Sequence, residues 1–414
     1  MNLRRVVVTG LGAVSPFGLG VDKLWAGLKA GESAIRPIEL FDVSDFPVKF
    51  AGEVKDYVGL DHFEKKKLRH LDRVTQFALL CADEAIKDSG IDLEASDRNR
   101  IGTIVGSGIG GLDTTEQQVL TLHNRGVRRV SPFLVPMMMI NAASGEVAIR
   151  HGLKGPNFCV SSACASGNHA LGLAMQMIRY GMADAVLAGG SEAALTPIGL
   201  AGFCAARALS KRNDEPTKAS RPFDKDRDGF VFGEGGALLF LESLEHAQAR
   251  GARIYAEFTG FSNTDDAGHI TAPSEDGEGA RRAIQGALED AKLEPTAIDY
   301  VNAHGTSTSL NDVMETQAIK DTFGEHAYKL AVSSTKSMTG HLLGASAGIE
   351  AVVMAKAIQE GIAPPTINHD EPDPACDLDY VPNEARSMEI NHAISNSFGF
   401  GGHNTCSVFS KFAE

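Results

Sequence analysis

The segment "NFCVSSACASGNHALGLA" (157–174) surrounds Cys164 with residues too small to act as its base. A cysteine just before a helix lies at the positive end of the helix dipole, beside free N–H groups. Both features favour the thiolate and predict a lowered pKa for the Cys164 thiol. The same N–H groups can hold the oxyanion that forms when sulfur attacks a carbonyl. A buried structural cysteine is the alternative, and it is the common state of a lone cysteine.

Two histidines far along the chain are candidate partners for this cysteine. His304 follows a predicted strand in "NAHGTSTSLND", and His341 lies in "SSTKSMTGHLLGASAG", between Lys336 and Glu350. Reacting groups are often found in loops of small residues at strand ends. Either histidine alone is equally well explained as a solvated or hydrogen-bonded residue. Together with the cysteine, the two histidines predict a Cys–His–His catalytic site.

A third segment, "SNSFGFGGHN" (395–404), alternates glycines with Phe398 and Phe400. We predict that it forms neither a stable helix nor a flat strand. Glycine allows backbone N–H groups to approach a ligand closely, and the two aromatic rings would gate an apolar pocket. A simple hairpin turn is the alternative. A phosphate loop is excluded because no Gly-Lys-Ser/Thr follows.

The segment "GSGIGG" (106–111) matches a dinucleotide-binding pattern after a predicted strand. That pattern also requires a second strand ending in Asp or Glu about twenty residues later, and the following sequence supplies none. "TGLGAVS" (9–15) lacks the third glycine. A nicotinamide oxidoreductase is therefore an outside alternative.

Composition narrows the classes of function. The 414 residues carry 39 basic and 53 acidic side chains, a net charge of −14, which argues against nucleic acid as a partner. The six cysteines show no CxxC or metal-binding spacing, so no metal site is expected, and five of them are interpreted as core residues. A short N-terminal apolar run and the absence of any run of about 18 apolar residues predict neither a signal peptide nor a membrane span. A reduced, cytoplasmic location is therefore expected.

Short β-branched runs alternate with amphipathic segments along the whole chain, and many runs are apolar on both faces, as in strands covered by helices on each side. Helices are predicted over 61–89, with Asp61 as cap and Gly90 as stop, from Cys164 to about Tyr180, and over 346–361. The similarity of "SSACASGNHALGLA" to "TGHLLGASAGIEAV" suggests an internal duplication, with halves 1–250 and 251–414. Strands are predicted at 5–10, 101–108, 184–190, 236–242, 254–262, 299–305, 330–335, 392–397 and 405–410.

These segments resemble those of a known family. "SSACASG", "NAHGTST", "SSTKSMTGHLLGA" and "SNSFGFGG" look like the four signature segments of the β-ketoacyl-acyl carrier protein synthases, and "SRPFDKDRDGFVFGEG" extends the likeness. The type II branch is the most similar. The resemblance implies an α/β, thiolase-like fold: two similar βαβαβαββ halves in a five-layered αβαβα arrangement, assembled as a homodimer.

The resemblance also implies roles for individual residues. Cys164 would be the acyl-accepting nucleophile, and His304 with His341 would promote decarboxylation and condensation. Lys336, linked to Glu350, would be a supporting lysine. The N–H groups of Cys164 and Phe400 would form the oxyanion hole, and Phe400, supported by Phe398, would be a gate. Thr306 and Thr308 would contact the pantetheine arm, while Ile109 and Phe203 would line the acyl pocket. Ser309 and His403 depart from the family pattern, which commonly has proline and threonine there.

The implied reaction is a decarboxylative Claisen condensation. An acyl group on the cysteine would join with malonyl-acyl carrier protein to give 3-oxoacyl carrier, CO₂ and free carrier. No free cofactor is expected, because 4'-phosphopantetheine is carried by the carrier protein. That partner is acidic, so basic clusters are the candidate docking sites, although a solvated helix face explains them equally well. The candidates are Lys66, Arg69, Arg128, Arg129 and Arg207, and the apolar stretch 131–145 is the candidate dimer interface.

Four alternatives remain near this interpretation. A type I synthase or a polyketide ketosynthase would use the same residues. A biosynthetic thiolase would need a second catalytic cysteine, and a non-catalytic chain-length partner would lack the nucleophile, so Cys164 argues against the latter. Chain-length preference does not follow from the sequence.

Overall fold

Most strands of the chain belong to one long mixed sheet. The computed structural model describes residues 3–54, 57–274 and 276–413. The strand order is β11-β10-β14-β15-β9-β1-β8-β7-β5-β6, and β2 (Gly18–Leu19) pairs with β1 outside this path. The bounds are β1 (Val6–Ser15), β5 (Ile101–Gly106), β6 (Asn157–Val160), β7 (Ala185–Glu192), β8 (Gly235–Ser243), β9 (Ala256–Asp265), β10 (Tyr300–Asn302), β11 (Ala331–Ser333), β14 (His392–Gly399) and β15 (His403–Ser410).

The sheet consists of two parts that meet at β1 and β9. Strands from before residue 250 lie on one side of this junction and strands from after it lie on the other. The two parts are joined by a short antiparallel contact, in which Val7 pairs with Glu257 and Val8 with Ala256. All nine predicted strands correspond to strands of the structure. The edge strand β6 was not predicted.

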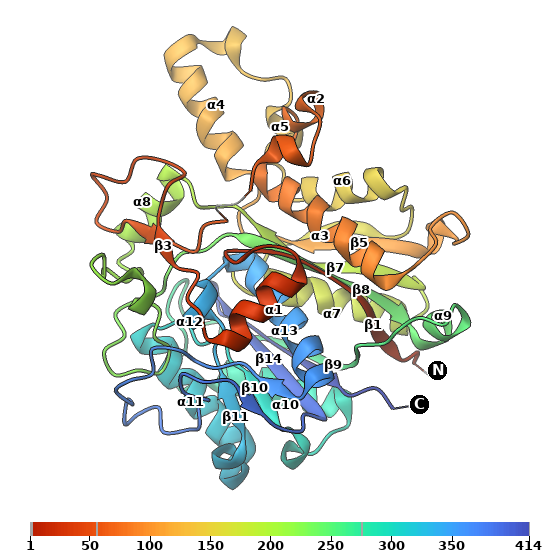
Figure 1. The fold of residues 1–414 in the computed structure, drawn as a ribbon, viewed down its shortest axis with the longest axis vertical. Coiled ribbons are helices and arrows are strands. Elements are labelled where there is room, and N and C mark those ends of the chain that lie inside the picture. Colours follow the sequence, from red (N-terminus) through yellow and green to blue (C-terminus); the bar gives the residue numbers. More distant parts are fainter. Residues whose placement is uncertain (1–2, 55–56, 275, 414) are drawn as a thin grey trace.

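Helices divide the molecule into five layers. Helices α7 (Ser166–Arg179) and α13 (Ser346–Glu360) lie between the two parts of the sheet and contact strands of both. Helices α3 (Arg73–Ser89) and α6 (Ala142–His151) cover the outer face of the first part. Helices α10 (Glu278–Ala291) and α11 (Ser309–Phe323) pack on the second (Figure 1). The predicted thiolase-like layering is confirmed.

Small residues allow the central layer to form. A Cβ atom at Gly172 on α7 would lie 2.3 Å from the ring of Phe261, and one at Gly348 on α13 would lie 2.5 Å from the carbonyl oxygen of Ala237. Only glycine permits these strands to approach the helices so closely. Helix α7 ends at Arg179 and α13 ends at Glu360, each one residue before its predicted end. Both helices are followed by a glycine with positive φ, Gly181 and Gly361 respectively.

The single helix predicted over 61–89 is wrong. The segment forms a 3-10 turn at Gly59–Asp61, a short helix α2 (Lys65–Leu68) and then α3. Helix α3 begins after Asp72, whose carboxylate accepts hydrogen bonds from the N–H of Val74 and from the hydroxyl of Thr114. Thr114 is distant in sequence, so its contribution to this N-cap could not be foreseen. The predicted stop at Gly90 is confirmed.

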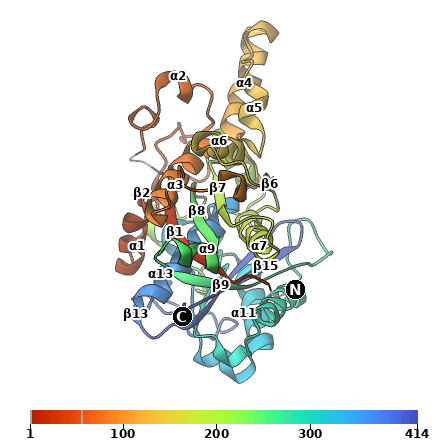
Figure 2. The same ribbon diagram turned by 90° about the vertical axis from the view of Figure 1, so that its right-hand side faces the viewer.

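Two further helices extend away from the layers. Helices α4 (Leu112–Arg125) and α5 (Leu134–Met138) project from the body (Figure 1 and Figure 2). Within the described residues, no helix is long and apolar enough to cross a membrane. The remaining helices and short strands are α1 (Val21–Ala30), α8 (Pro197–Ala205), α9 (Leu244–Ala249), α12 (Lys336–Thr339), β3 (Arg36–Pro37), β4 (Phe50–Ala51), β12 (Ile362–Ala363) and β13 (Arg386–Ser387).

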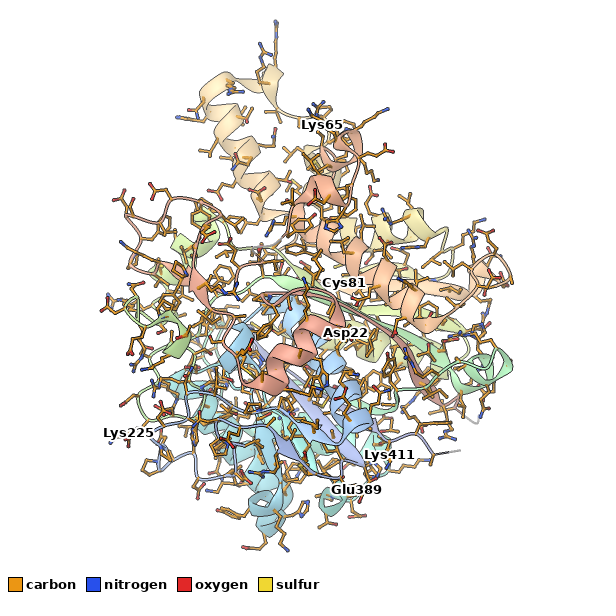
Figure 3. All side chains as sticks on the ribbon, viewed as in Figure 1. Asp22, Lys65, Cys81, Lys225, Glu389 and Lys411 are labelled. Carbon is orange, nitrogen blue, oxygen red and sulfur yellow. The ribbon has the colours of Figure 1, made fainter. Side chains whose placement is uncertain are left out.

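All six cysteines are free thiols. Cys81, Cys376 and Cys406 are buried, as expected for core residues, and Figure 3 shows Cys81 in the interior. Cys159 and Cys204 are half-buried, so the interpretation of all five as core residues holds for three of them.

Candidate active site

Cys164 lies in a tight turn between β6 and α7. Ala163 adopts φ 50°, a left-handed conformation that is costly for a residue with a side chain. The hydroxyl of Ser166 closes the turn, because it accepts the N–H of Ser162 at 2.9 Å and donates to the carbonyl oxygen of Ala163 at 2.6 Å. A Cβ at Gly399 would lie 2.8 Å from the carbonyl oxygen of Ser162. Glycine is therefore required where the end of β14 meets this turn.

His341 contacts the thiol directly. Its Nε2 lies 3.0 Å from Sγ of Cys164, and its Nδ1 lies 3.0 Å from the hydroxyl of Ser346. That hydroxyl also accepts the N–H of Leu342 at 2.9 Å, so Ser346 is itself held in place and fixes the imidazole through the ring nitrogen that does not face Cys164. Phe230 packs edge-on against the ring, with centroids 5.4 Å apart.

His304 lies next to His341. The two rings are 5.4 Å apart and nearly perpendicular, at 87°. The loop of His304 is held by Glu315, whose carboxylate accepts the N–H groups of His304 and Gly305, each at 2.8 Å. Nδ1 of His304 is buried and has no hydrogen-bond partner in the part of the chain that the structure describes. Phe398 packs against the ring at 5.6 Å.

Lys336 acts on both histidines from outside the cavity. It forms an ion pair with Glu350, and both side chains are only 2% exposed. Burial lowers the pKa of His304 and of His341 well below the usual range, and the charge of Lys336 lowers both further. Both imidazoles are therefore neutral at physiological pH, the state in which one ring nitrogen donates and the other accepts.

The thiol of Cys164 differs from the sequence-based expectation. Burial raises its pKa to about 12, and this effect outweighs the charge of Lys336 and the N–H groups of Phe400 and Cys164, which lower it. The predicted lowering is therefore wrong for the free protein. The predicted helix-terminal environment is present, but desolvation of the thiol is the larger effect.

One cavity of about 550 Å³ collects most of the predicted site residues. Phe400 is 41% exposed at its surface, where the chain turns from β14 to β15. The cavity is lined by Cys164, His304, His341, Ile109, Phe203, Thr306, Thr308, Phe398, Phe400 and Arg207, among others. Lys336 and Glu350 lie behind this lining. Lys66, Arg69, Arg128 and Arg129 are exposed and do not line the cavity.

The glycine-rich segment 395–404 is a hairpin. Strand β14 continues to Gly399 and β15 begins at His403, with positive φ at Gly401 and Gly402 in the turn. The prediction that it forms no flat strand is wrong, and the simpler alternative of a hairpin turn is correct.

Two residues depart from the family pattern. The first, Ser309, is the first residue of α11, a position where proline is also accepted. His403 lies with Nδ1 3.5 Å from Asp265.

Sequence reasoning missed several residues of the site. Phe230 and Leu343 line the cavity, while Glu315 and Ser346 hold the two histidines. Ser346 offered a signal, because it follows His341 by five residues at the start of a predicted helix. The others come from segments whose approach depends on tertiary packing.

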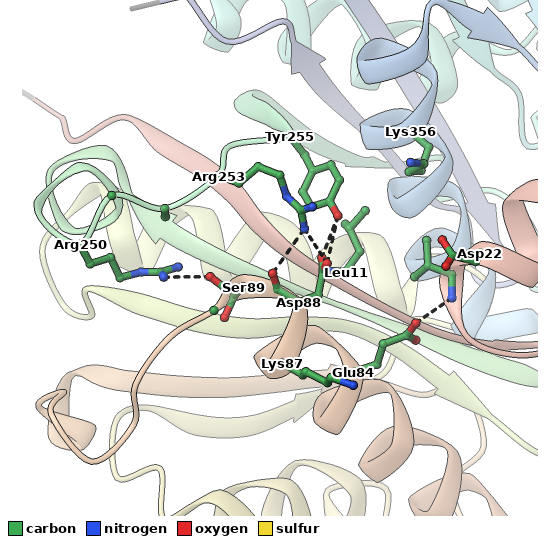
Figure 4. A pocket seen from close by; sticks show the side chains of 14 residues that line it. Leu11, Asp22, Glu84, Lys87, Asp88, Ser89, Arg250, Arg253, Tyr255 and Lys356 are labelled. Carbon is green, nitrogen blue, oxygen red and sulfur yellow. Dashed lines mark hydrogen bonds and ion pairs between the residues drawn. The ribbon is translucent and has the colours of Figure 1, made fainter.

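A second pocket, of about 610 Å³, lies between α3, β1 and the segment after α9 (Figure 4). Two of its charged side chains pair with each other: Asp88 accepts from Arg253, and also from the hydroxyl of Tyr255. Its lining includes no cysteine or histidine. Among the described residues, no group of three or more His, Cys, Asp or Glu side chains is arranged to hold a metal ion.

Comparison with known proteins identifies the family. Residues 3–247 match the model of the beta-ketoacyl synthase N-terminal domain, and residues 255–370 match that of the C-terminal domain. The chain therefore belongs to the β-ketoacyl synthase family.

Individual relatives cover the whole chain. It is 53% identical over 412 residues to a 3-oxoacyl-[acyl-carrier-protein] synthase 2 of Synechocystis sp., covering 100% of this chain and 99% of that one. It is 51% identical over 411 residues to the protein of the same name in Coxiella burnetii, covering 99% of each. Among solved structures, it resembles the ishigamide ketosynthase/chain length factor (TM-score 0.93, 36% identity, 99% and 100% covered) and a beta-ketoacyl synthase from Burkholderia phymatum (TM-score 0.92, 39% identity, 99% and 100% covered).

Proposed function

We propose that the protein is a 3-oxoacyl-[acyl-carrier-protein] synthase that elongates fatty acyl chains by decarboxylative condensation. The single observation that carries this proposal is the meeting of Cys164, His304 and His341 in one cavity, with Nε2 of His341 3.0 Å from the sulfur. The names of the full-length relatives support the same reaction.

The first half of the reaction transfers an acyl group. Sulfur of Cys164 attacks the carbonyl carbon of an acyl thioester, and the bond to the carrier's sulfur breaks, so the carrier leaves as a thiol with the proton that Cys164 gives up. Neutral His341 can accept this proton and pass it on. The N–H groups of Cys164 and Phe400 face the sulfur and stabilise the oxyanion of the tetrahedral intermediate.

The second half forms the carbon–carbon bond. When malonyl thioester loses CO₂, the electron pair of the broken bond becomes an enolate on the thioester oxygen. Neutral His304 donates a hydrogen bond to this oxygen, and so does His341 in the tautomer that carries its proton on Nε2, in which Nδ1 accepts from the hydroxyl of Ser346. Each such donor is worth about 2.7–4 kcal/mol. The carbanion then attacks the acyl carbon on Cys164, and the thiolate leaves. The product is a 3-oxoacyl chain two carbons longer.

The carrier protein and its pantetheine arm are assigned to the cavity mouth. Thr306 and Thr308, whose hydroxyls are 3.0 Å apart on the cavity wall, contact the arm, which the carrier brings with it, so no free cofactor takes part. Arg207 at the cavity and the exposed Lys66, Arg69, Arg128 and Arg129 bind the acidic carrier. One structural relative is described as a ketosynthase in complex with an acyl-carrier protein, which supports this partner.

We further assign the chain to a homodimer, with halves 1–250 and 251–414 in each subunit and a cytoplasmic location. Strand β6 lies at the end of the strand order and, among the described residues, pairs with β5 alone. Helices α4 and α5 and the residue before α5 expose apolar side chains that include Val119, Phe133, Val135 and Met138. An interface of this kind buries on the order of 2,000 Å² or more. Sedimentation of an active monomer would contradict the dimer.

A reconstituted reaction tests the function. The protein is mixed with acyl carriers of increasing chain length and malonyl carrier, and 3-oxoacyl carrier is detected by mass spectrometry. Product two carbons longer than the acyl donor is expected from short to long chains. A polyketide ketosynthase is the second candidate, favoured by the TM-score of 0.92 to a ketosynthase that is described in complex with a type II PKS acyl-carrier protein. Repeated extension without reduction of the oxo group would support it instead.

A further inference from the structure

Glu192, the last residue of β7, is a buried carboxylate for which the reaction above gives no role. It is 0% exposed and forms no ion pair among the described residues. A buried charge without a basic partner is costly unless hydrogen bonds replace its hydration. Such a residue needs an explanation within the structure.

Two segments supply those hydrogen bonds. The first is the start of "GSGIGG": the hydroxyl of Ser107 donates at 2.9 Å, and the N–H groups of Gly108 and Ile109 donate at 2.7 and 3.3 Å. The second is the turn after His341, where the N–H of Gly344 donates at 3.2 Å. The glycine-rich motif thus binds a side chain of its own protein through N–H groups suited to an anion.

Both segments form walls of the catalytic cavity. Ile109 and Leu343 line it, and each is next in sequence to a residue bonded to Glu192. The approach is close, because a Cβ at Gly108 or at Gly344 would lie 3.0 or 2.8 Å from Oε2 of Glu192. One carboxylate therefore joins two walls that belong to different halves of the chain.

We propose that Glu192 is a positioning residue: it fixes the Ile109 wall against the turn after His341 and places a negative charge near Cys164. A rigid wall at Ile109 discriminates between acyl chains of different length, while a mobile wall accepts them more equally. Burial raises the pKa of Glu192, while its hydrogen-bond donors oppose that rise and favour the ionised form. The ionised carboxylate disfavours the thiolate, consistent with the raised pKa of the Cys164 thiol, to which Glu192 contributes. The role in chain selection rests on the proposed function, whereas the effect on the thiol does not.

Glu192→Gln tests both parts. The amide is of similar size, but it carries no charge and its NH₂ group faces backbone N–H groups, so one bond to the Ile109 segment is lost. We expect alkylation of Cys164 by iodoacetamide at neutral pH to become about three- to tenfold faster, because a fall of one pKa unit raises the thiolate fraction tenfold. We also expect the ratio of acylation rates for short and long acyl carriers to move at least about threefold towards one.

Two further variants separate the effect of the negative charge of Glu192 from the effect of its hydrogen bonds to the cavity wall. Ser107→Ala removes one donor and keeps the charge, so it should flatten chain selectivity without changing the alkylation profile, and it carries the test if Glu192→Gln does not fold. Glu84→Gln is the matched control. Glu84 is a half-buried carboxylate that, like Glu192, accepts backbone N–H groups, those of Ala13 and Val21, but it lies at the second pocket (Figure 4). Both of its readouts should stay within about twofold of the parent protein.

The outcomes are distinct. If Glu192→Gln folds and either its alkylation profile or its chain selectivity matches that of Glu84→Gln, the inference is overturned. Absence of condensation with every acyl carrier would instead remove the proposed function. The alkylation measurement needs no carrier, so it would still decide whether Glu192 acts on the thiol.

Discussion

The turns before α7 and α13 have nearly the same backbone but carry different chemistry. Ala163 and Leu343 each lie three residues before their helix and adopt left-handed φ values of 50° and 49°. In each turn a serine at the first helical position accepts the N–H of the residue four before it, at 2.9 Å in both cases. These pairs are Ser166 with Ser162, and Ser346 with Leu342.

The two turns differ in the residue directly after the left-handed one. In the first turn that position holds Cys164, whose sulfur points into the cavity. In the second it holds Gly344, whose N–H bonds to Glu192 and whose carbonyl oxygen would be 2.8 Å from a Cβ at Gly167. In the second turn the candidate reactive residue is His341, which lies two residues before the left-handed Leu343 rather than directly after it. The same backbone turn therefore carries the proposed nucleophile before α7 and supports the proposed base before α13.

Removal of the nucleophile should have the largest effect. Cys164→Ala should abolish enzyme acylation and product formation, because no other side chain can hold the acyl group. It should leave malonyl decarboxylation measurable, since both histidines remain, and Cys164→Gln, whose amide resembles the acyl thioester, should enhance it. Labelled acyl carrier and CO₂ release measure the two steps. Cys159→Ala, the nearby half-buried cysteine, is the control. A Cys164→Ala protein that still made 3-oxoacyl product would refute the assignment.

The histidines should show the reverse pattern. His304→Ala or His341→Ala should slow decarboxylation by about 10²–10³-fold, the usual cost of one lost oxyanion donor. Acylation of Cys164 should survive, at least in His304→Ala, because among the described residues it is His341 whose imidazole lies within hydrogen-bond distance of the sulfur. The same pair of assays applies. Normal CO₂ release from both variants would show that the enolate is stabilised elsewhere.

Lys336 should set the acid limit of activity. Its charge lowers the pKa of both histidines, so Lys336→Met combined with Glu350→Gln should raise those pKa values towards the ordinary value of about 6.5. Below the new pKa an imidazolium forms and cannot accept the thiol proton, so the acid limb of the rate profile should move to higher pH. Acylation of Cys164 by labelled acyl carrier, measured from pH 5 to 8, reports this shift, and an unmoved acid limb would contradict it.

The paired serines provide the finest test of the comparison. Ser166→Ala and Ser346→Ala each leave a buried N–H unsatisfied, so each should lower the free energy of unfolding by about 1–3 kcal/mol. Only Ser346→Ala frees the ring of His341, and we expect it to slow decarboxylation by up to about 10²-fold. Ser166→Ala should mainly slow acylation. Denaturant unfolding and the two rate assays separate these effects. Equal losses in both assays for both variants would mean that the turns are not specialised.

Much of this protein is determined locally by its sequence. The apolar runs specified all nine predicted strands, because strands buried on both faces need continuous apolar residues. Small residues before α7 and α13 marked the two reactive turns, and glycines marked the helix ends. The motifs around Cys164, His304 and His341 identified the family, which the comparisons confirmed.

Other properties depend on residues that only folding brings together. Helix α3 begins after its N-cap Asp72, whose carboxylate also accepts a hydrogen bond from the distant Thr114, whereas periodicity predicted a continuous helix from 61. The pKa of Cys164 is raised because packing removes water from the thiol, an effect that helix position alone does not reveal. Glu192 gains its partners from two distant segments. Sequence patterns report a residue's neighbours along the chain, whereas burial and long-range hydrogen bonds depend on the tertiary structure.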